Sequence, residues 1–138
     1  MATTNRKTTA HELVSAREDE IAAKIVDAAF AVHNRLGPGL LEKVYEICSC
    51  HELRKRGLSC KRQVAVPIVY DNITFDEGLQ LDVSVEDLVI CEVKAADKPN
   101  PVWEAQLLSY MRLTGKRLGF IVNFNVALIR DGIKRMVL

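Results

Sequence analysis

The spacing of apolar residues divides the chain into helical and extended segments. From about residue 17 to residue 36, apolar residues recur every three or four positions, which predicts a helix with one buried side. The motif Gly37-Pro38-Gly39 interrupts this pattern, and a second helix is expected to run from there to Gly57. The residues expected on its buried side are Leu40, Leu41, Val44, Cys48 and Leu53.

Extended segments follow. Apolar and polar residues alternate over 64–70, where Pro67 indicates an edge strand or an irregularity, and again over 79–85. The stretch 88–95 is mostly apolar. Asn100-Pro101 is typical of a helix start, and that helix is expected to end at Gly115.

The segment 118–124 is almost continuously apolar, as expected for a central strand that is covered on both faces, and 133–137 is expected to form a last short strand. The element order α-α-β-β-β-α-β predicts an α/β (α+β) fold with a mixed central sheet flanked by helices. We expect a flexible tail over 1–16 and a single domain over 17–138, since no repeat or internal linker is visible.

Composition excludes several classes of protein. The chain has 138 residues, of which 49% are hydrophobic and 27% charged, and its formal net charge of +1 excludes a histone-like nucleic-acid binder. No apolar run approaches the roughly 18 residues of a membrane span, and the polar N-terminus predicts no secretory signal. The four cysteines lack a Cys-x-x-Cys motif, which favours free thiols in a reducing, cytoplasmic location. A zinc site at Cys48, Cys50 and His51 is disfavoured, because Cys50 would point away from the other two on a helix.

The segments on either side of Glu86-Asp87 are expected to form a hairpin whose register decides its chemistry. With a two-residue loop, charged and apolar side chains would mix on both faces. A register shifted by one residue places Asp82 opposite Glu92 and gives one apolar face and one polar face. The apolar face would then hold Leu79, Leu81, Val83, Val85, Val89, Cys91, Val93 and Ala95.

In this register Asp82, Glu92 and Lys94 share the polar face. Opposed Cβ atoms lie about 4.5–5.5 Å apart, so the two carboxylates repel each other unless a cation compensates them. Mg²⁺ suits such a site, because it binds a few carboxylate oxygens and retains several waters. The alternative is an exposed strand face that carries an ordinary Glu–Lys pair.

Two helical segments add polar candidates. Gln106 and Tyr110 are four residues apart and share a side of their helix, while Ala105, Leu108 and Met111 are expected in the core. Surface solvation of Gln106 and partial burial of Tyr110 remain alternatives. Glu42 lies in the first turn of the second helix, where an acid is also favoured by the helix dipole.

The ordered set Asp82, Glu92-Val93-Lys94 and Gln106-x-x-x-Tyr110 resembles the PD-(D/E)xK nuclease superfamily, with the element of its RecB-like branch. Gly39-x-x-Glu42-x-x-Tyr45 resembles the small bacterial GxxExxY family within it, and 121–126 is also typical of that family. The resemblance covers residue 18 to the end of the chain. Leu81 precedes Asp82 where the superfamily pattern has a proline. The resemblance implies a restriction-endonuclease-like core.

The resemblance implies a Mg²⁺-dependent nuclease in which Mn²⁺ can substitute. Glu42, Asp82, Glu92 and the Val93 carbonyl would bind the metal. Lys94 would orient or deprotonate the attacking water. Gln106 would position Lys94 or a water. His33 and Tyr45 would support the site from outside the ligand set, although the apolar neighbours of His33 favour a core or helix-end position.

Nucleic acid, in particular DNA, is the implied partner. Tyr110, Arg112, Lys116 and Arg117 would contact it, and two further basic clusters, 54–56 and 61–62, are candidates for phosphate contacts. Basic helix ends are, however, commonly just solvated. Trp103 could stack on a base, or it packs in the core. A homodimer or an unknown protein partner is plausible for so small a core. The alternative functions are a catalytically silent or partner-dependent binding module and a nucleotide or sugar-phosphate hydrolase.

Overall fold

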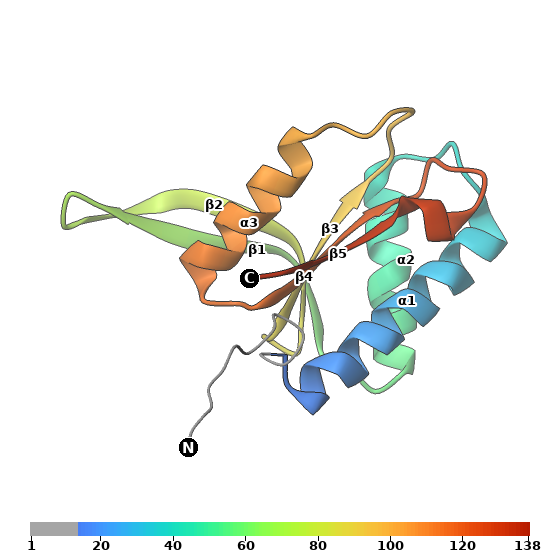
Figure 1. Cartoon of the computed structure of the whole chain (residues 1–138), viewed down its shortest axis with the longest axis horizontal. Helices are drawn as coiled ribbons and strands as arrows, with labels where there is room; N and C mark the ends of the chain where they lie inside the picture. The colour runs from blue at the N-terminus through green and yellow to red at the C-terminus, as the bar shows by residue number, and fades with distance from the viewer. Residues whose placement is uncertain (1–13) are drawn as a thin grey trace, which may run out of the picture.

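The computed structural model describes residues 14–138, and most of the predicted tail therefore lies outside the described residues. Figure 1 shows α-helices on both sides of a central sheet and a long hairpin that extends away from the body. The elements are α1 (Ala16–Leu36), α2 (Glu42–Lys55), β1 (Cys60–Tyr70), β2 (Ile73–Val85), β3 (Val89–Lys94), α3 (Val102–Thr114), β4 (Leu118–Asn123), the 3₁₀ helix η3 (Ile129–Gly132) and β5 (Ile133–Val137). The predicted order α-α-β-β-β-α-β is confirmed, and β5 completes it.

The sheet has the spatial order β1-β2-β3-β4-β5, so neighbours along the chain are also neighbours in space. All neighbouring pairs are antiparallel except β3 and β4, which are parallel and joined by α3. Helices α1 and α2 cover one face and α3 covers the other (Figure 1). This is an α+β fold with a mixed sheet between two helical layers, consistent with a PD-(D/E)xK nuclease-like core.

Each face of the sheet has its own apolar core. The larger core joins α1 and α2 to the sheet through residues such as Ile21, Leu53 and Phe120. The smaller core joins α3 to the sheet through Leu81, Ile90, Leu107, Met111 and Ile121. Strand β4 is buried along its whole length, as its apolar run predicts for a strand that is covered on both faces.

Most of the predicted chain breaks lie where the sequence places them. Ser15 caps α1 and Val14 is buried, so these two residues, which were expected in the tail, belong to the folded structure. Strand β1 is an edge strand, and its register shifts between Val66 and Ile68, at the position of Pro67. Gly115 ends α3 in the left-handed conformation.

The predicted buried side of α2 is correct for Leu53, which is buried, and for Cys48, which packs against the core, but it is wrong at the start of the helix. Leu40, Leu41 and Val44 are exposed, whereas Tyr45 is completely buried. The Tyr45 ring stacks on Phe124 with centroids 4.5 Å apart, and its hydroxyl donates to the Gly37 carbonyl at 2.6 Å. The same hydroxyl accepts from the Leu40 amide at 3.0 Å. Burial of this aromatic ring fixes the start of α2 so that Leu40, Leu41 and Val44 face outward.

The prediction of four free thiols is also wrong, because Cys50 and Cys60 form a disulfide. Cys50 lies on the buried side of α2, and Cys60 begins β1 directly opposite. Their Cα atoms are 5.6 Å apart, within the range for a disulfide. Cys48 and Cys91 are free. Among residues 14–138, no helix combines the length and apolar character needed to cross a membrane.

The Tyr45 anchor can be tested by substitution. Tyr45→Phe keeps the stacked ring and loses both hydrogen bonds, so we expect a loss of about 1 kcal/mol in the free energy of unfolding. Tyr45→Ala also removes the ring and leaves a cavity, with an expected loss of about 3–5 kcal/mol. Chemical denaturation measures both. Tyr70→Phe is the matched control, because Tyr70 is 74% exposed at the hairpin tip and should change nothing. A Tyr45→Ala protein as stable as the wild type would contradict this role.

Candidate active site on strands β2 and β3

The candidate site lies where β2 separates from β3. The two strands pair at Val85 with Val89 and at Val83 with Cys91, which confirms the predicted register and sets Asp82 beside Glu92. The regular ladder then stops. Gln63, the residue of β1 that would lie opposite Asp82, has a positive φ of 52° and is missing from the ladder.

The faces of β2 exchange at this interruption. Val83 belongs to the core under α1 and α2, whereas Leu81 belongs to the core under α3. The prediction that Leu81 and Val83 share one face is therefore wrong. In a regular strand, residues two positions apart lie on the same face. Here β2 turns at Asp82, and within the described residues Asp82 has no partner in the strand ladder.

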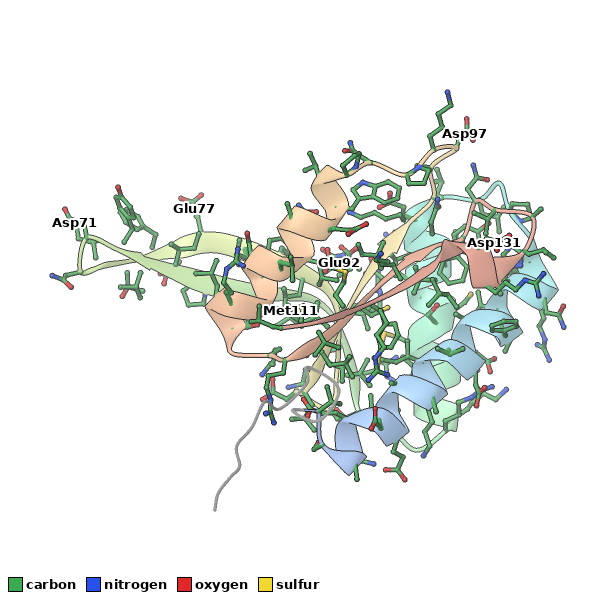
Figure 2. All side chains as sticks on the ribbon, viewed as in Figure 1. Asp71, Glu77, Glu92, Asp97, Met111 and Asp131 are labelled. Carbon is green, nitrogen blue, oxygen red and sulfur yellow. A yellow bond between two sulfur atoms is a disulfide. The ribbon has the colours of Figure 1, made fainter. Side chains whose placement is uncertain are left out.

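Asp82 and Glu92 replace the missing ladder bonds with reciprocal side-chain bonds. The Asp82 backbone amide donates to Glu92 Oε2 at 3.0 Å, and the Val93 amide donates to Asp82 Oδ2 at 2.9 Å. Each carboxylate thus has one oxygen fixed by a backbone amide, while its second oxygen accepts no protein hydrogen bond among the described residues. Figure 2 shows Glu92 in the middle of the molecule, close to α3. The sequence predicted that the two acids meet, and the hydrogen bonds show how they are held.

Burial makes Glu92 an unusual carboxyl. Glu92 is only 4% exposed. Burial, followed by the nearby negative charge of Asp82, raises the pKa of Glu92 to about 8. The bond from the Asp82 amide and the charge of Lys94 oppose this shift without cancelling it. A pair of carboxylates in this state requires either a proton or a cation.

Lys94 ends β3 on the same side as Glu92. Its Nζ lies 5.6 Å from the centre of the Trp103 ring, in the first turn of α3. This contact attracts the ammonium to the ring face, and the ammonium makes no hydrogen bond or ion pair within residues 14–138. Trp103 is half-buried, so it packs against the site and still reaches a surface.

Helix α3 brings two more polar groups to the site. Gln106 Nε2 donates to the Tyr110 hydroxyl at 2.9 Å. Burial, followed by the charges of Glu92 and Asp82, raises the pKa of Tyr110. The buried side of α3 is formed by Leu107 and Met111, while Ala105, which was expected in the core, is exposed.

The sequence analysis missed an acid, Glu46. This α2 residue is 4% exposed and accepts from Arg62 Nε at 3.0 Å and from the Gln63 side-chain amide at 2.9 and 3.0 Å. Its charge also contributes to the raised pKa of Glu92. Glu42, one turn earlier, is exposed and makes no hydrogen bond or ion pair with Asp82, Glu92 or Lys94. A sequence signal existed, because Glu46 lies three and seven residues before Ser49 and Leu53 on the buried side of α2.

The remaining candidates lie elsewhere. His33 Nε2 bonds to the Val126 carbonyl at 2.8 Å and ties α1 to the loop before η3. Tyr45 has its own partners in the core. Lys116 Nζ lies 3.3 Å from an Asp87 oxygen, and Arg117 lies 3.7 Å from Glu18, so both face acids beside the β2–β3 turn. Arg112 is exposed in the last turn of α3. None of these side chains is hydrogen-bonded to the two carboxylates.

Comparison with known protein families agrees with this geometry. The family model described as the PD-(D/E)XK nuclease superfamily matches residues 19–136. The chain belongs to the PD-(D/E)XK nuclease superfamily. No curated protein and no solved structure matches it. Membership in this superfamily implies a nuclease-like activity and a nucleic-acid substrate.

The carboxylates of this site can be compared with the ligands that a divalent metal needs. Among residues 14–138, no three His, Cys, Asp or Glu side chains converge as a metal site, so Glu42 is not brought into a ligand set. Asp82 and Glu92 each keep one carboxylate oxygen that accepts no hydrogen bond from residues 14–138. Mg²⁺ is commonly held by one or two carboxylates together with retained waters, so the pair fits this ion. Burial, followed by the charge of Asp82, raises the pKa of Glu92, and a divalent cation would oppose both effects by favouring the carboxylate anion.

The pKa of Glu92 predicts how stability depends on pH without metal. The folded protein keeps the Glu92 proton up to about pH 8, whereas an ordinary glutamate loses it near 4.5. The folded state therefore binds more protons between these values, and the free energy of unfolding falls as pH rises. In EDTA, denaturation at pH 6 and pH 8 should show a fall of about 2 kcal/mol due to this group. Glu92→Gln should remove that part of the slope, and identical slopes in the two proteins would contradict the assignment.

Proposed function

We propose that the chain is a Mg²⁺-dependent phosphodiesterase that hydrolyses nucleic acid, in particular DNA. The observation that carries this proposal is the reciprocal hydrogen-bonded pair of Asp82 and Glu92, with the half-buried Lys94 two residues after Glu92 on β3. The sequence motif, the strand register and the superfamily membership all support a role for these same residues. Mn²⁺ is expected to substitute for Mg²⁺, since it also prefers carboxylate and water ligands.

The metal would be held by Asp82, Glu92 and the Val93 carbonyl. When bound, it would supply a Lewis acid that polarises the phosphodiester and offsets the charge developing on it. Backbone amides hold one oxygen of each acid, so the other oxygen is oriented before substrate arrives. Binding requires Glu92 as the anion, so it displaces the proton that burial favours.

Lys94 would orient the attacking water and stabilise negative charge on a nonbridging phosphate oxygen. The water oxygen forms a bond to phosphorus, the bond from phosphorus to the leaving oxygen breaks, and the proton lost by the water passes to solvent as the leaving oxygen gains one. Gln106 and Tyr110 would hold the substrate or a water from the α3 side. The bond between these two side chains supports an assignment to the RecB-like branch with its Gln-x-x-x-Tyr element. The motif from Gly39 to Tyr45 supports the GxxExxY family.

Glu46 is the α2 carboxylate proposed to act with this site. It is already bound to Arg62 and Gln63, so its part would be to set the local negative potential that favours a divalent cation. Glu42 stays a weaker candidate that would reach the site only through water.

Cleavage assays test the proposal directly. Labelled single-stranded, double-stranded and branched DNA should be cut with Mg²⁺ or Mn²⁺ and left intact in EDTA. Asp82→Asn, Glu92→Gln and Lys94→Met should each reduce kcat/KM by at least about 100-fold, because each removes a group that acts on the reacting phosphate.

Asp27→Asn is the matched control. Asp27 is an exposed acid on α1, and α1 covers the face of the sheet away from α3, so this change should leave cleavage unaltered. Circular dichroism verifies that each variant is folded. Absence of cleavage by the folded wild type on all three substrates with both metals would count against an autonomous nuclease and favour a silent binding module.

A further inference from the structure

A cavity adjoins the candidate active site on the α3 side of the sheet. It has a volume of about 390 Å³, within the roughly 300–1,000 Å³ of small-ligand sites. It lies between the loop after β3, the first turn of α3, and the segment from the end of β4 to the start of β5. Figure 2 labels two residues that border it, Asp97 in the loop after β3 and Asp131 in η3.

Strand register places this cavity beside Glu92 and Lys94. Ile121 and Asn123 line the cavity, and they are the β4 partners of Glu92 and Lys94 in the parallel ladder. Neighbouring strands lie about 4.8 Å apart, and paired residues project to the same face. Trp103 lines the cavity too, and it is the residue whose ring Lys94 approaches. A group in the cavity is thus about one nucleotide's reach from a phosphate at Lys94.

The lining selects the chemistry of the occupant. Trp103 offers an aromatic ring, and Pro99, Pro101 and Ile133 add apolar surface. Three carboxylates, those of Asp97, Glu104 and Asp131, outnumber the one ammonium of Lys134. Such a lining repels a phosphate, whereas it accepts hydrogen bonds from the amino and ring N–H groups of a base.

We propose that this cavity binds one unpaired nucleobase of the substrate, stacked on Trp103, while the adjoining phosphate lies at Lys94. The inference rests on the proposed function and specifies its substrate class as nucleic acid with an unpaired nucleotide next to the cleaved bond. Bases inside a duplex have both faces covered by their neighbours, so only a single-stranded or flipped base can enter.

Intrinsic fluorescence reports directly on the cavity, because Trp103 is the only tryptophan in the chain. In EDTA, where no cleavage is expected, a short single-stranded oligonucleotide should quench this fluorescence saturably, and the same strand annealed to its complement should not. Equal quenching by both forms, or quenching by neither, would overturn the inference.

Substitution of Trp103 separates stacking from general attraction. Anisotropy of a labelled single strand in EDTA should show binding to Trp103→Leu weakened by about 5- to 150-fold, the range of one base stacked on an aromatic ring. Trp103→Phe keeps an aromatic face and should recover most of the affinity. A Trp103→Leu protein that is folded and binds as tightly as the wild type would refute stacking.

A charge reversal distinguishes a base from a phosphate as occupant. Asp131 is exposed and makes no side-chain hydrogen bond or ion pair within residues 14–138, so Asp131→Lys should fold normally. Asp131→Lys should bind a single strand more weakly than Asp27→Lys, a control that makes the same charge change on α1, away from the cavity. Stronger binding by Asp131→Lys than by this control would show that the cavity takes a phosphate.

The two proposals fail in different ways. Mg²⁺-dependent cleavage without single-strand quenching of Trp103 would overturn the base cavity and leave the nuclease proposal intact. Single-strand quenching of Trp103 without cleavage would overturn the nuclease proposal and leave the base cavity intact.

Discussion

The site depends on one exchange of hydrogen bonds between two strands. Where β2 leaves β3, the Asp82 amide donates to Glu92 and the Val93 amide donates to Asp82. These bonds satisfy backbone groups that the interrupted ladder would leave unpaired, and a buried unpaired amide costs about 1–3 kcal/mol. The same bonds hold two acids together in a poorly solvated place. Structure and chemistry are therefore coupled, because the groups that close the sheet are also those that can receive a divalent cation.

Helices on the two faces of the sheet surround this exchange. Helix α3 supplies Trp103, Gln106 and Tyr110 on one face. On the other face, Glu46 of α2 accepts hydrogen bonds from Arg62 and Gln63 of β1. At Gln63 of β1 and Asp82 of β2, the strands turn so that the following core residues face the opposite helical layer. Asp82 therefore lies between the two layers. Negative charge accumulates there with few cations, which is the electrostatic state expected of a metal-binding site before the metal arrives.

Much of the fold could be predicted from local patterns. The helix breaks at Gly37 and Gly115 and the edge position of β1 at Pro67 depend on backbone preferences that single residues reveal. The register that pairs Asp82 with Glu92 followed from separating charges from apolar residues. Tertiary packing decided the rest. Burial of the Tyr45 ring fixed the start of α2, contact between α2 and β1 brought Cys50 to Cys60, and the turn of β2 moved Leu81 to the other core. None of these leaves a periodic signal.

The central claim is that Asp82 and Glu92 together hold a divalent ion. Anomalous diffraction from crystals of the protein grown with Mn²⁺ tests this most directly. The account predicts one strong peak within coordination distance of a free oxygen of each carboxylate, lost in crystals of Glu92→Gln. A peak at another place, or no peak between the two acids at saturating Mn²⁺, would contradict it.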